Sequence, residues 1–407
     1  MRALLLERNK KVSRRLVRLF TSAGYDAEAV DDPEAVTAVI GDSADTITVL
    51  GADAFDGDMV AKILSENTHI RGILWTAEPL KRALRYMIDT EGLSNICGRK
   101  DFESPPRPWE LLMIARRLRD PGSARTKFSD FLYWGYSGFQ EQVESTAHRD
   151  DLVARVEDFV DKLGLPRRVG ESLGELSHEL LMNAMFDAPV DHNGKHKYAA
   201  DRKASLQLPA DEQPLFRVAS DGTRLAVQVI DSFGRLRRSH VFNGLARGLE
   251  GGEMDTSHGG AGLGMVVCHN STVAMFYDVQ TDQQTQATGI FDMDLNLREF
   301  RIQAKSLHFF QTPGRPASPT ANSIAGYVAG SPQSHGPRSA SEQTLAPTSV
   351  QGSVQVSGQI SGKASGKAAK QSSSSTSRTS QGLPSSQGKN TLPDEPSGHG
   401  SGQTPGR

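Results

Sequence analysis

Short runs of apolar residues alternate with amphipathic stretches over residues 1–120. The runs RALLL, ITVLGA and GILWTA, at 2–6, 47–52 and 72–77, are typical of strands buried on both faces. The polar-rich stretch after the first run carries its apolar residues at helical spacing. Strands that alternate with helices in this way predict an α/β domain with a doubly wound parallel sheet.

A second pattern occupies residues 141–305. The segments 149–166 and 168–189 carry apolar residues at helical spacing, and each ends at a proline. The run LFRVASDGTRLAVQVIDSF, at 215–233, is typical of a hairpin that turns at its Asp-Gly pair. A further helix and hairpin follow. Helices on one side of a mostly antiparallel or mixed sheet predict an α+β two-layer sandwich.

Composition changes sharply near residue 311, where Ser, Gly, Gln, Pro and Thr replace large apolar residues. Such a sequence buries too little apolar surface to offset its ordering entropy, so we expect a disordered tail over 306–407. From residue 311 it carries eight Lys or Arg against three Asp or Glu and is mildly basic. A tether or a phosphorylatable docking tail is the alternative to a merely solvated one. Residues 121–140 are expected to be a linker.

Charge and cysteine content narrow the possible functions. A net charge of −2 gives no reason to expect nucleic acid or an anionic membrane as a partner. The two cysteines, Cys97 and Cys268, lie far apart in sequence and suit neither a disulfide framework nor a metal-binding spacing. The N-terminal apolar run is too short for a signal peptide, and no run of about 18 apolar residues occurs. We therefore expect a cytoplasmic protein.

Two polar residues lie four apart in the predicted helix that contains HELLMNA. Glu179 and Asn183 should project from one face of that helix. A carboxylate and a carboxamide oxygen stacked in this way can activate a water and bind Mg²⁺, which prefers oxygen ligands. An exposed polar stripe on an amphipathic helix is the alternative.

Two further features follow in order along the chain. Asp231 ends the apolar run VQVID, and the glycine-rich segment SHGGAGLGMVVCH occupies 257–269. An acid at a strand end is often a turn former, but in a pocket it can accept the amine of adenine. The glycines lack the lysine of a P-loop and the spacing of a dinucleotide fingerprint. Glycines before a helix N-terminus suit a phosphate group, and a flexible loop is the alternative.

Taken in order, these three motifs resemble those of the Bergerat fold, the ATP-binding domain shared by histidine kinases, gyrase and mismatch-repair ATPases. The subgroup with the most similar pattern is the anti-sigma-factor serine kinases. The resemblance implies ATP and Mg²⁺ as ligands. It makes Glu179 the general base, Asn183 the Mg²⁺ ligand and Asp231 the acceptor of the adenine amine.

The same resemblance assigns the surroundings of the nucleotide. Gly234 would allow close approach to adenine, and residues 236–259 would form a mobile lid. Phe233 stands where many members carry a glycine, a departure in the turn before the lid. The phosphate-side loop would comprise Gly260, Gly262, Leu263 and Gly264. Weaker candidates for phosphate or ribose contacts are Lys195, Lys197 and Tyr198.

Residues 1–120 resemble the receiver domain of bacterial response regulators. Glu7 matches part of the acidic pair of receivers, Thr76 the hydroxyl that ends the fourth strand, and Lys100 the lysine that ends the fifth. The third strand is expected to end two residues before Asp53, the nearest candidate phospho-acceptor. Phosphoryl transfer needs a metal and a correctly placed acid together. We therefore expect a degenerate receiver-like domain that docks proteins, with phosphorylation of Asp53 as the alternative.

The combined pattern predicts a bacterial signalling protein that binds ATP and Mg²⁺ and acts on a protein partner. One hypothesis is a serine/threonine kinase that uses Glu179 as its base. The other is a non-catalytic switch in which ATP orders the lid and creates a partner-binding surface. A scaffold that binds no nucleotide ranks third. His178 lies within the Glu/Asn helix, so autophosphorylation on histidine is not expected. A homodimer is implied by the kinase resemblance alone.

Overall fold

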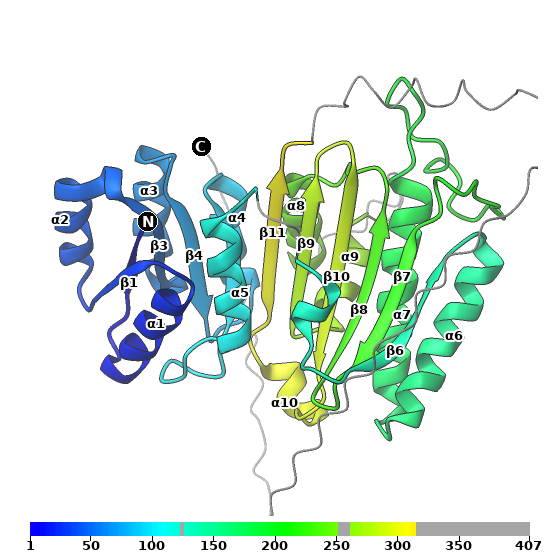
Figure 1. The fold of residues 1–407 in the computed structure, drawn as a ribbon, viewed down its shortest axis with the longest axis horizontal. Helices are drawn as coiled ribbons and strands as arrows, with labels where there is room; N and C mark the ends of the chain where they lie inside the picture. Colours follow the sequence, from blue (N-terminus) through cyan, green and yellow to red (C-terminus); the bar gives the residue numbers. More distant parts are fainter. Residues whose placement is uncertain (123–125, 251–260, 315–407) are drawn as a thin grey trace, which may run out of the picture. The chain divides into compact units, whose positions relative to one another are not determined.

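The computed structural model describes residues 1–122, 126–250 and 261–314, all of which belong to one compact unit, Met1–Tyr327. Their strands form an eleven-stranded sheet in the order β2-β1-β3-β4-β5-β11-β9-β10-β8-β7-β6. Figure 1 shows the first five strands in one half of this sheet and the six later ones in the other. The predicted α/β and α+β regions therefore share one sheet, and their separation into two domains is not confirmed.

The strands of the N-terminal half are parallel to one another. They are β1 (Arg2–Leu6), β2 (Asp26–Val30), β3 (Ile47–Asp53), β4 (Arg71–Thr76) and β5 (Leu93–Gly98). Their order, β2-β1-β3-β4-β5, is that of a doubly wound sheet. The helices of this half are α1 (Lys10–Ser22), α2 (Pro33–Ser43), α3 (Gly57–Glu66), α4 (Lys81–Asp89) and α5 (Pro108–Arg119), with 3₁₀ turns at Ala44–Thr46 and Ala54–Asp56. The predicted strands of this region are confirmed.

Local sequence sets where the helices begin and which face they bury. The Asn9 side chain accepts hydrogen bonds from two backbone N–H groups in the first turn of α1. The Asp32 side chain caps α2 by accepting one hydrogen bond, from the N–H of Glu34, ahead of a proline at the first helical position. Val12, Leu16 and Phe20 recur at helical spacing on the buried face of α1. The polar face of that helix stays in solvent.

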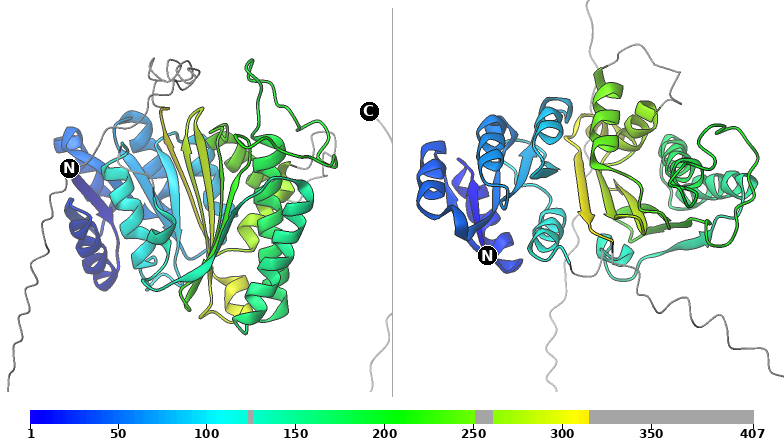
Figure 2. Two further views of the ribbon diagram at one scale, coloured as in Figure 1. Left: turned by 45° about the vertical axis from the view of Figure 1, so that its right-hand side comes forward. Right: turned by 90° about the horizontal axis from the view of Figure 1, so that it is seen from above.

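The C-terminal half is a mixed sheet covered by helices. Its strands are β6 (Ser137–Gln142), β7 (Leu215–Ser220), β8 (Arg224–Asp231), β9 (Ala274–Gln280), β10 (Gln284–Asp292) and β11 (Ser306–Thr312). Neighbouring strands pair antiparallel except β9 and β11, which are parallel. The helices are α6 (Thr146–Lys162), α7 (Arg167–Met182), α8 (Arg238–Glu250), α9 (Ala261–Asn270) and the short α10 (Leu297–Ile302). Figures 1 and 2 show α7, α8 and α9 on one face of β8 to β11, as the two-layer prediction requires.

Strand β11 joins the two halves and corrects the predicted start of the tail. It pairs with β9 along its length and with β5 at Leu307 and His308. Residues 306–312 therefore do not belong to a disordered tail. The apolar residues Leu307, Phe309 and Phe310 are buried in the shared core. The rest of the predicted tail, from 315, lies outside the described residues.

The predicted linker is also partly ordered. A 3₁₀ turn, Phe128–Phe131, inserts two phenylalanines into the core, and the ring of Phe131 lies 5.0 Å from that of Phe276 on β9. Strand β6 begins at Ser137, inside the range assigned to the linker. These apolar residues anchor the crossing between the halves. Within the described ranges, no helix is long and apolar enough to span a bilayer.

Candidate functional site

A cavity of about 300 Å³ lies between the end of α7, strands β8 and β10, and the starts of α8 and α9. This volume is at the lower end of the range of roughly 300–1,000 Å³ for small-molecule pockets. Nine of the sixteen residues that line it are apolar or aromatic, and the other seven are polar or charged. The lining residues are Leu180, Asn183, Ala184, Asp187, Ala188, His196, Ala199, Val229, Asp231, Arg235, Leu236, His240, Met265, Tyr277, Thr285 and Ala287.

Asp231 is the buried carboxylate of this cavity. It is the last residue of β8, is 7% exposed, and lies opposite Thr285 of β10 in the sheet register. Its Oδ1 accepts hydrogen bonds from the backbone N–H groups of Phe233 at 2.9 Å and Gly234 at 3.2 Å. Burial raises the pKa of Asp231, while these two N–H groups act in the opposite direction. The two N–H groups of the turn therefore fix the orientation of the Asp231 carboxylate. Thr285 is a neighbouring hydroxyl residue that no sequence motif predicts.

Gly234 has a structural role that differs from the predicted one. Its φ is +62°, and a Cβ on it would lie 2.0 Å from the carbonyl oxygen of Gln280. Only glycine meets both conditions without strain. The glycine therefore lets the turn after β8 pack against the turn between β9 and β10. It is not among the described residues that line the cavity.

A π-helical turn, Asn183–Asp187, continues α7 and places two oxygen-bearing side chains on the cavity wall. The N–H of Ala188 donates to the carbonyl of Asn183 at 2.9 Å, the i to i+5 bond that defines this turn. Arg202 donates through Nη2 to Asn183 Oδ1 at 3.4 Å and forms an ion pair of 3.6 Å with Asp187 Oδ2. Burial raises the pKa of Asp187, and the nearby Arg202 and His196 oppose that rise. Single π turns inside helices are frequent at functional sites.

Glu179 does not share this cavity with Asn183, although one helical turn separates them. Glu179 lines a neighbouring hollow together with His178 and Val267, and it is not among the described residues that line the cavity of Asn183 and Asp231. The carboxylate points toward α9, because a Cβ on Gly264 would lie 2.4 Å from Glu179 Oε2. The structure thus brings Glu179 to Gly264 and Asn183 to Asp231.

The glycine segment lies only partly in the described residues. Gly260 is outside them, while Gly262, Leu263 and Gly264 form the first turn of α9. A Cβ on Gly262 would lie 3.0 Å from the carbonyl oxygen of Gly244, and one on Gly248 would lie 2.7 Å from that of Gly262. The glycines therefore allow close packing of α8 and α9. Helix α8 also occupies the first part of the predicted lid.

The weaker candidates after the Glu/Asn helix are not among the described residues that line the cavity. Lys197 forms an ion pair with Glu212, and the hydroxyl of Tyr198 donates to the same carboxylate at 2.9 Å. Lys195 is exposed. The cationic and imidazole groups that line the cavity are instead Arg235, His196 and His240, and no sequence motif marks them.

In the N-terminal half, Asp53 is the last residue of β3, so the predicted end of that strand two residues earlier is wrong. The buried guanidinium of Arg99 donates to Asp53 Oδ2 at 2.5 Å and to Glu7 Oε2 at 3.1 Å. Burial raises the pKa of Asp53, against the effects of the Phe55 N–H and Arg99. Lys100, expected at the position that Arg99 fills, is exposed. A guanidinium thus already occupies the space between these two acids.

Thr76 and Asp56 complete the surroundings of this acidic pocket. Thr76 ends β4 as predicted, and its hydroxyl accepts the N–H of Glu78 at 2.9 Å. Asp56 accepts two hydrogen bonds from Arg8, at 2.6 and 2.8 Å. The carboxylates at and just after the end of β3 are therefore both paired with an arginine, Asp53 with Arg99 and Asp56 with Arg8. A divalent cation between them would have to displace a guanidinium.

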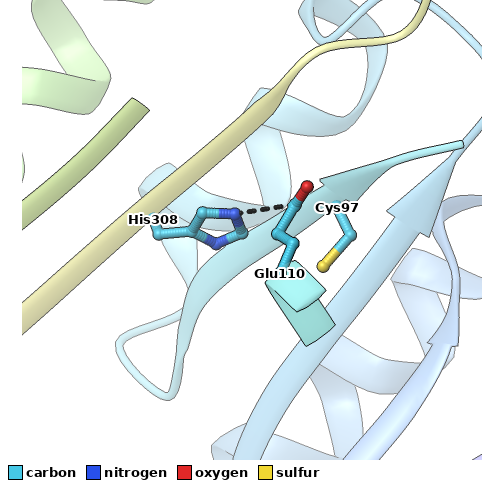
Figure 3. A group of neighbouring side chains, drawn as sticks. All are labelled: Cys97, Glu110 and His308. Carbon is cyan, nitrogen blue, oxygen red and sulfur yellow. Dashed lines mark hydrogen bonds and ion pairs between the residues drawn. The ribbon is translucent and has the colours of Figure 1, made fainter. Parts of the chain in front are cut away.

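A second polar cluster lies at the junction of β5, α5 and β11. Figure 3 shows Cys97, Glu110 and His308 converging there, and their donor atoms all lie within 4.8 Å of one another. Cys, His and Glu are zinc ligands, but Glu110 is already bound by Arg107 at 3.1 Å and lies 3.0 Å from His308 Nε2. Burial raises the pKa of Glu110, but the hydrogen bond to His308 and the charge of Arg107 outweigh it, so the pKa is lowered overall. We assign the cluster to the cohesion of the junction.

Comparisons with known proteins give similar solved structures but no family. No family model matches the chain, and no curated protein matches it significantly. An atypical orphan response regulator with a phosphorylation-independent mechanism is 15% identical, with a TM-score of 0.24, over 29% of this chain and 92% of its own. The SiaB–SiaC complex of Pseudomonas aeruginosa is 9% identical, with a TM-score of 0.26, over 40% of this chain and 92% of the matched one. Values this low do not extend either protein's function to this chain.

Proposed function

We propose that this chain is a signalling protein that binds an adenine nucleotide in the cavity between α7, β8 and β10. The observation that carries the proposal is Asp231, a buried carboxylate at the end of β8 that reaches an otherwise mostly apolar cavity. A buried carboxylate is costly unless hydrogen-bond donors satisfy it. The turn supplies two donors to Oδ1. A ligand amine in the cavity would add a further donor.

The chemistry of Asp231 favours adenine over guanine. Adenine presents an exocyclic amine at the position where guanine presents a carbonyl oxygen. A carboxylate accepts hydrogen bonds from the first and repels the second. The apolar side chains of Leu180, Val229 and Ala287 provide apolar surface against which a base could pack. The cavity volume of about 300 Å³ suits a nucleoside-sized group.

Nucleotide-dependent regulation of a partner, without phosphoryl transfer, fits the arrangement best. Glu179 does not line the cavity, and Asn183 is held by Arg202. A bound nucleotide would contact α8 through His240 and α9 through Met265, so its presence would bias the arrangement of those helices. The N-terminal half, with its arginine-paired acids, would serve as a docking module for protein partners.

Phosphoryl transfer to a serine or threonine of a partner is the second candidate function. One observation favours it: Glu179 lies a single helical turn from Asn183 and beside Gly264 in the first turn of α9. A Glu179→Gln variant that retains nucleotide binding but loses ATP turnover would support it. An absence of turnover in the wild type would leave the regulatory function.

Calorimetric titration of the full chain with ATP, ADP, adenosine and GTP tests the proposal. We expect adenine ligands to bind and GTP to bind at least tenfold more weakly. Asp231→Asn should weaken the adenine ligands at least tenfold, because a hydrogen bond to a charged group contributes about 1.5–3 kcal/mol. Asp292→Asn is the matched control, since Asp292 ends β10 at the opposite end of the β8–β10 ladder. Equal binding of ATP and GTP, or no binding of either, would contradict the proposal.

A further inference from the structure

The phosphate subsite expected from the sequence is not part of the described cavity. Gly262, Leu263 and Gly264 are not among the described residues that line it. Asn183, the expected Mg²⁺ ligand, does line it, but its Oδ1 accepts a hydrogen bond from the Arg202 guanidinium at 3.4 Å. That positive charge opposes the approach of a cation, so Mg²⁺ does not fit these side chains as they lie. The phosphates of a nucleotide in this cavity therefore need other partners on its wall.

Two imidazoles lie on the cavity wall, and they come from separate segments. His240 belongs to α8, and His196 ends a short turn that follows the π turn of α7. An antiparallel bridge between Val190 and His196, and a hydrogen bond from the Lys197 N–H to the Pro189 carbonyl at 3.0 Å, fix this turn. Both histidines line the cavity and are exposed. Ordered backbone thus brings two imidazoles to one wall.

The ring nitrogens of these two histidines are available to a ligand. Neither ring forms a hydrogen bond or an ion pair within the part of the chain that the structure describes. Arg235 lies beside the same turn, because a Cβ on Gly194 would lie 3.7 Å from Arg235 Nη2. Arg235 also lines the cavity, but it is already paired with Asp282 at 2.5 Å. The two imidazoles are therefore better placed than this guanidinium to receive an anion.

The charges that face the histidines come from α7, α8 and the segment after α7. The pKa of His240 is lowered, first by partial burial of the ring and then by the charges of Arg237 and His196. His196 acts on Asp187, the carboxylate at the end of the π turn, and Asp187 is also paired with Arg202 at 3.6 Å. An anion beside both rings would offset the repulsion between their protonated forms and so favour protonation.

From this arrangement we propose that His196 and His240 bind the phosphates of the nucleotide, with its base at Asp231 on the strand wall of the cavity. A protonated imidazole donates from both ring nitrogens, and such charged donors form strong hydrogen bonds to phosphate oxygens. The proposal rests on the proposed function, because the base at Asp231 sets the direction of the nucleotide. His196 and His240 are then phosphate-binding residues that take no part in recognising adenine, and binding takes up a proton.

Calorimetric titration of the full chain with ATP and with adenosine, in excess Mg²⁺ at pH 6.5 and pH 8.0, tests the proposal. At pH 6.5, His196→Gln and His240→Gln should each weaken ATP about tenfold, because a charged hydrogen bond is lost, and leave adenosine within twofold. His192→Gln is the matched control, since His192 is an exposed histidine of the same turn and is not among the described residues that line the cavity. It should leave both ligands unchanged.

The pH dependence gives a readout that a merely structural role would not move. His240 has a lowered pKa and is neutral at pH 8.0, whereas a bound phosphate favours its protonated form. ATP affinity relative to adenosine should therefore rise as pH falls from 8.0 to 6.5. The ratio to adenosine removes any effect of Asp231 protonation, which acts on both ligands. The double variant His196→Gln/His240→Gln should lose this dependence on pH.

The outcomes separate this proposal from the proposed function. Wild-type ATP affinity in either single variant overturns the proposal, and so does a ratio of ATP to adenosine affinity that is the same at both pH values. Equal weakening of ATP and adenosine by the variants assigns the histidines a structural role and overturns it as well. In each of these cases adenosine still binds to the wild type, and the proposed function stands. Failure of the wild type to bind either ligand contradicts both, and unfolding midpoints of the variants confirm that each one folds.

Discussion

Asp231 and Gly234 occupy the tight turn after β8, and each fixes a different side of it. Asp231 accepts the backbone N–H groups of the turn and faces the cavity. Gly234 faces the other way, against the carbonyl oxygen of Gln280. The glycine allows the backbone conformation of the turn, and the aspartate presents a carboxylate to the cavity. A change at one position should therefore affect stability and a change at the other should affect binding.

Gly234→Ala should destabilise the protein more than a simple change of backbone preference would. Its φ of +62° is unfavourable for alanine, and the added Cβ would meet Gln280 at 2.0 Å. Gly222 is the matched control, with φ of +88° and no described atom within 4 Å of its Cβ position. Urea unfolding should show a loss of about 1 kcal/mol for Gly222→Ala and a clearly larger loss for Gly234→Ala. Equal losses would contradict the close contact.

Both cysteine thiols should be unreactive in the folded protein. Cys97 and Cys268 are fully buried, and burial raises the pKa of each well above the ordinary value. A disulfide reagent such as Ellman's reagent should therefore modify neither thiol in the native chain at pH 8 and both in 6 M guanidinium chloride. Rapid modification of one thiol in the native state would show that its surroundings are open.

At the scale of elements, strand β11 joins the N-terminal and C-terminal halves into one sheet. Its neighbours are β9 on one side and β5 on the other. Two buried ion-pair clusters brace this junction: Arg107 with Glu110 and His308, and Arg117 with Asp278. Removing one partner of a buried pair leaves an uncompensated charge, which is costly. Substitution of one of these buried charged residues should therefore lower the free energy of unfolding more than the same substitution at the surface.

Glu110→Gln should destabilise the protein by about 3–5 kcal/mol, because it leaves Arg107 without its buried carboxylate. The matched control is Glu141→Gln, a partly exposed glutamate that also pairs with an arginine and a histidine and should cost under about 1 kcal/mol. The pKa of folded Glu110 lies below its ordinary 4.5. Its charge therefore stabilises the fold above that pH and is lost as pH falls through the folded value. Chemical unfolding at pH 7 and pH 3 should show a smaller difference between wild type and Glu110→Gln at pH 3.

Sequence patterns predicted elements better than they predicted contacts. Apolar runs identified β1, β3 and β4, because strands buried on both faces read as continuous apolar segments. The pattern SLHFFQT of β11 was assigned to the tail because a single strand beside low-complexity sequence has no local partner to mark it. Arg99 was missed in favour of Lys100, since a shift of one residue in a strand reverses which side chain faces inward.

In the candidate site, too, local motifs could be predicted from the sequence better than contacts between distant segments. Asp231 and Asn183 were found because their motifs are local, and the structure brings both to one cavity. Thr285 could not be predicted, because it reaches that cavity from a strand distant in sequence and belongs to no recognisable motif. Glu179 was expected beside Asn183, yet the π turn and the packing of α9 direct it to a different hollow.

For the whole molecule, a continuous sheet predicts cooperative unfolding. The described strands form one hydrogen-bonded order across both halves, with a shared hydrophobic core. Thermal unfolding followed by far-ultraviolet circular dichroism, which reports on both halves, should coincide with unfolding followed by the fluorescence of Trp75, buried in the N-terminal half. Replacing Trp109 and Trp134 by phenylalanine isolates that signal. Two separated transitions would show that the halves are independent domains.

The central claim is that the cavity beside Asp231 recognises adenine, and competition titration of ATP against GTP on wild-type and Asp231→Asn chains tests it most directly. The account predicts that the wild type prefers ATP at least tenfold and that Asp231→Asn, with an unchanged unfolding midpoint, loses most of that preference. A folded Asp231→Asn variant that still binds ATP with wild-type affinity and selectivity would contradict it.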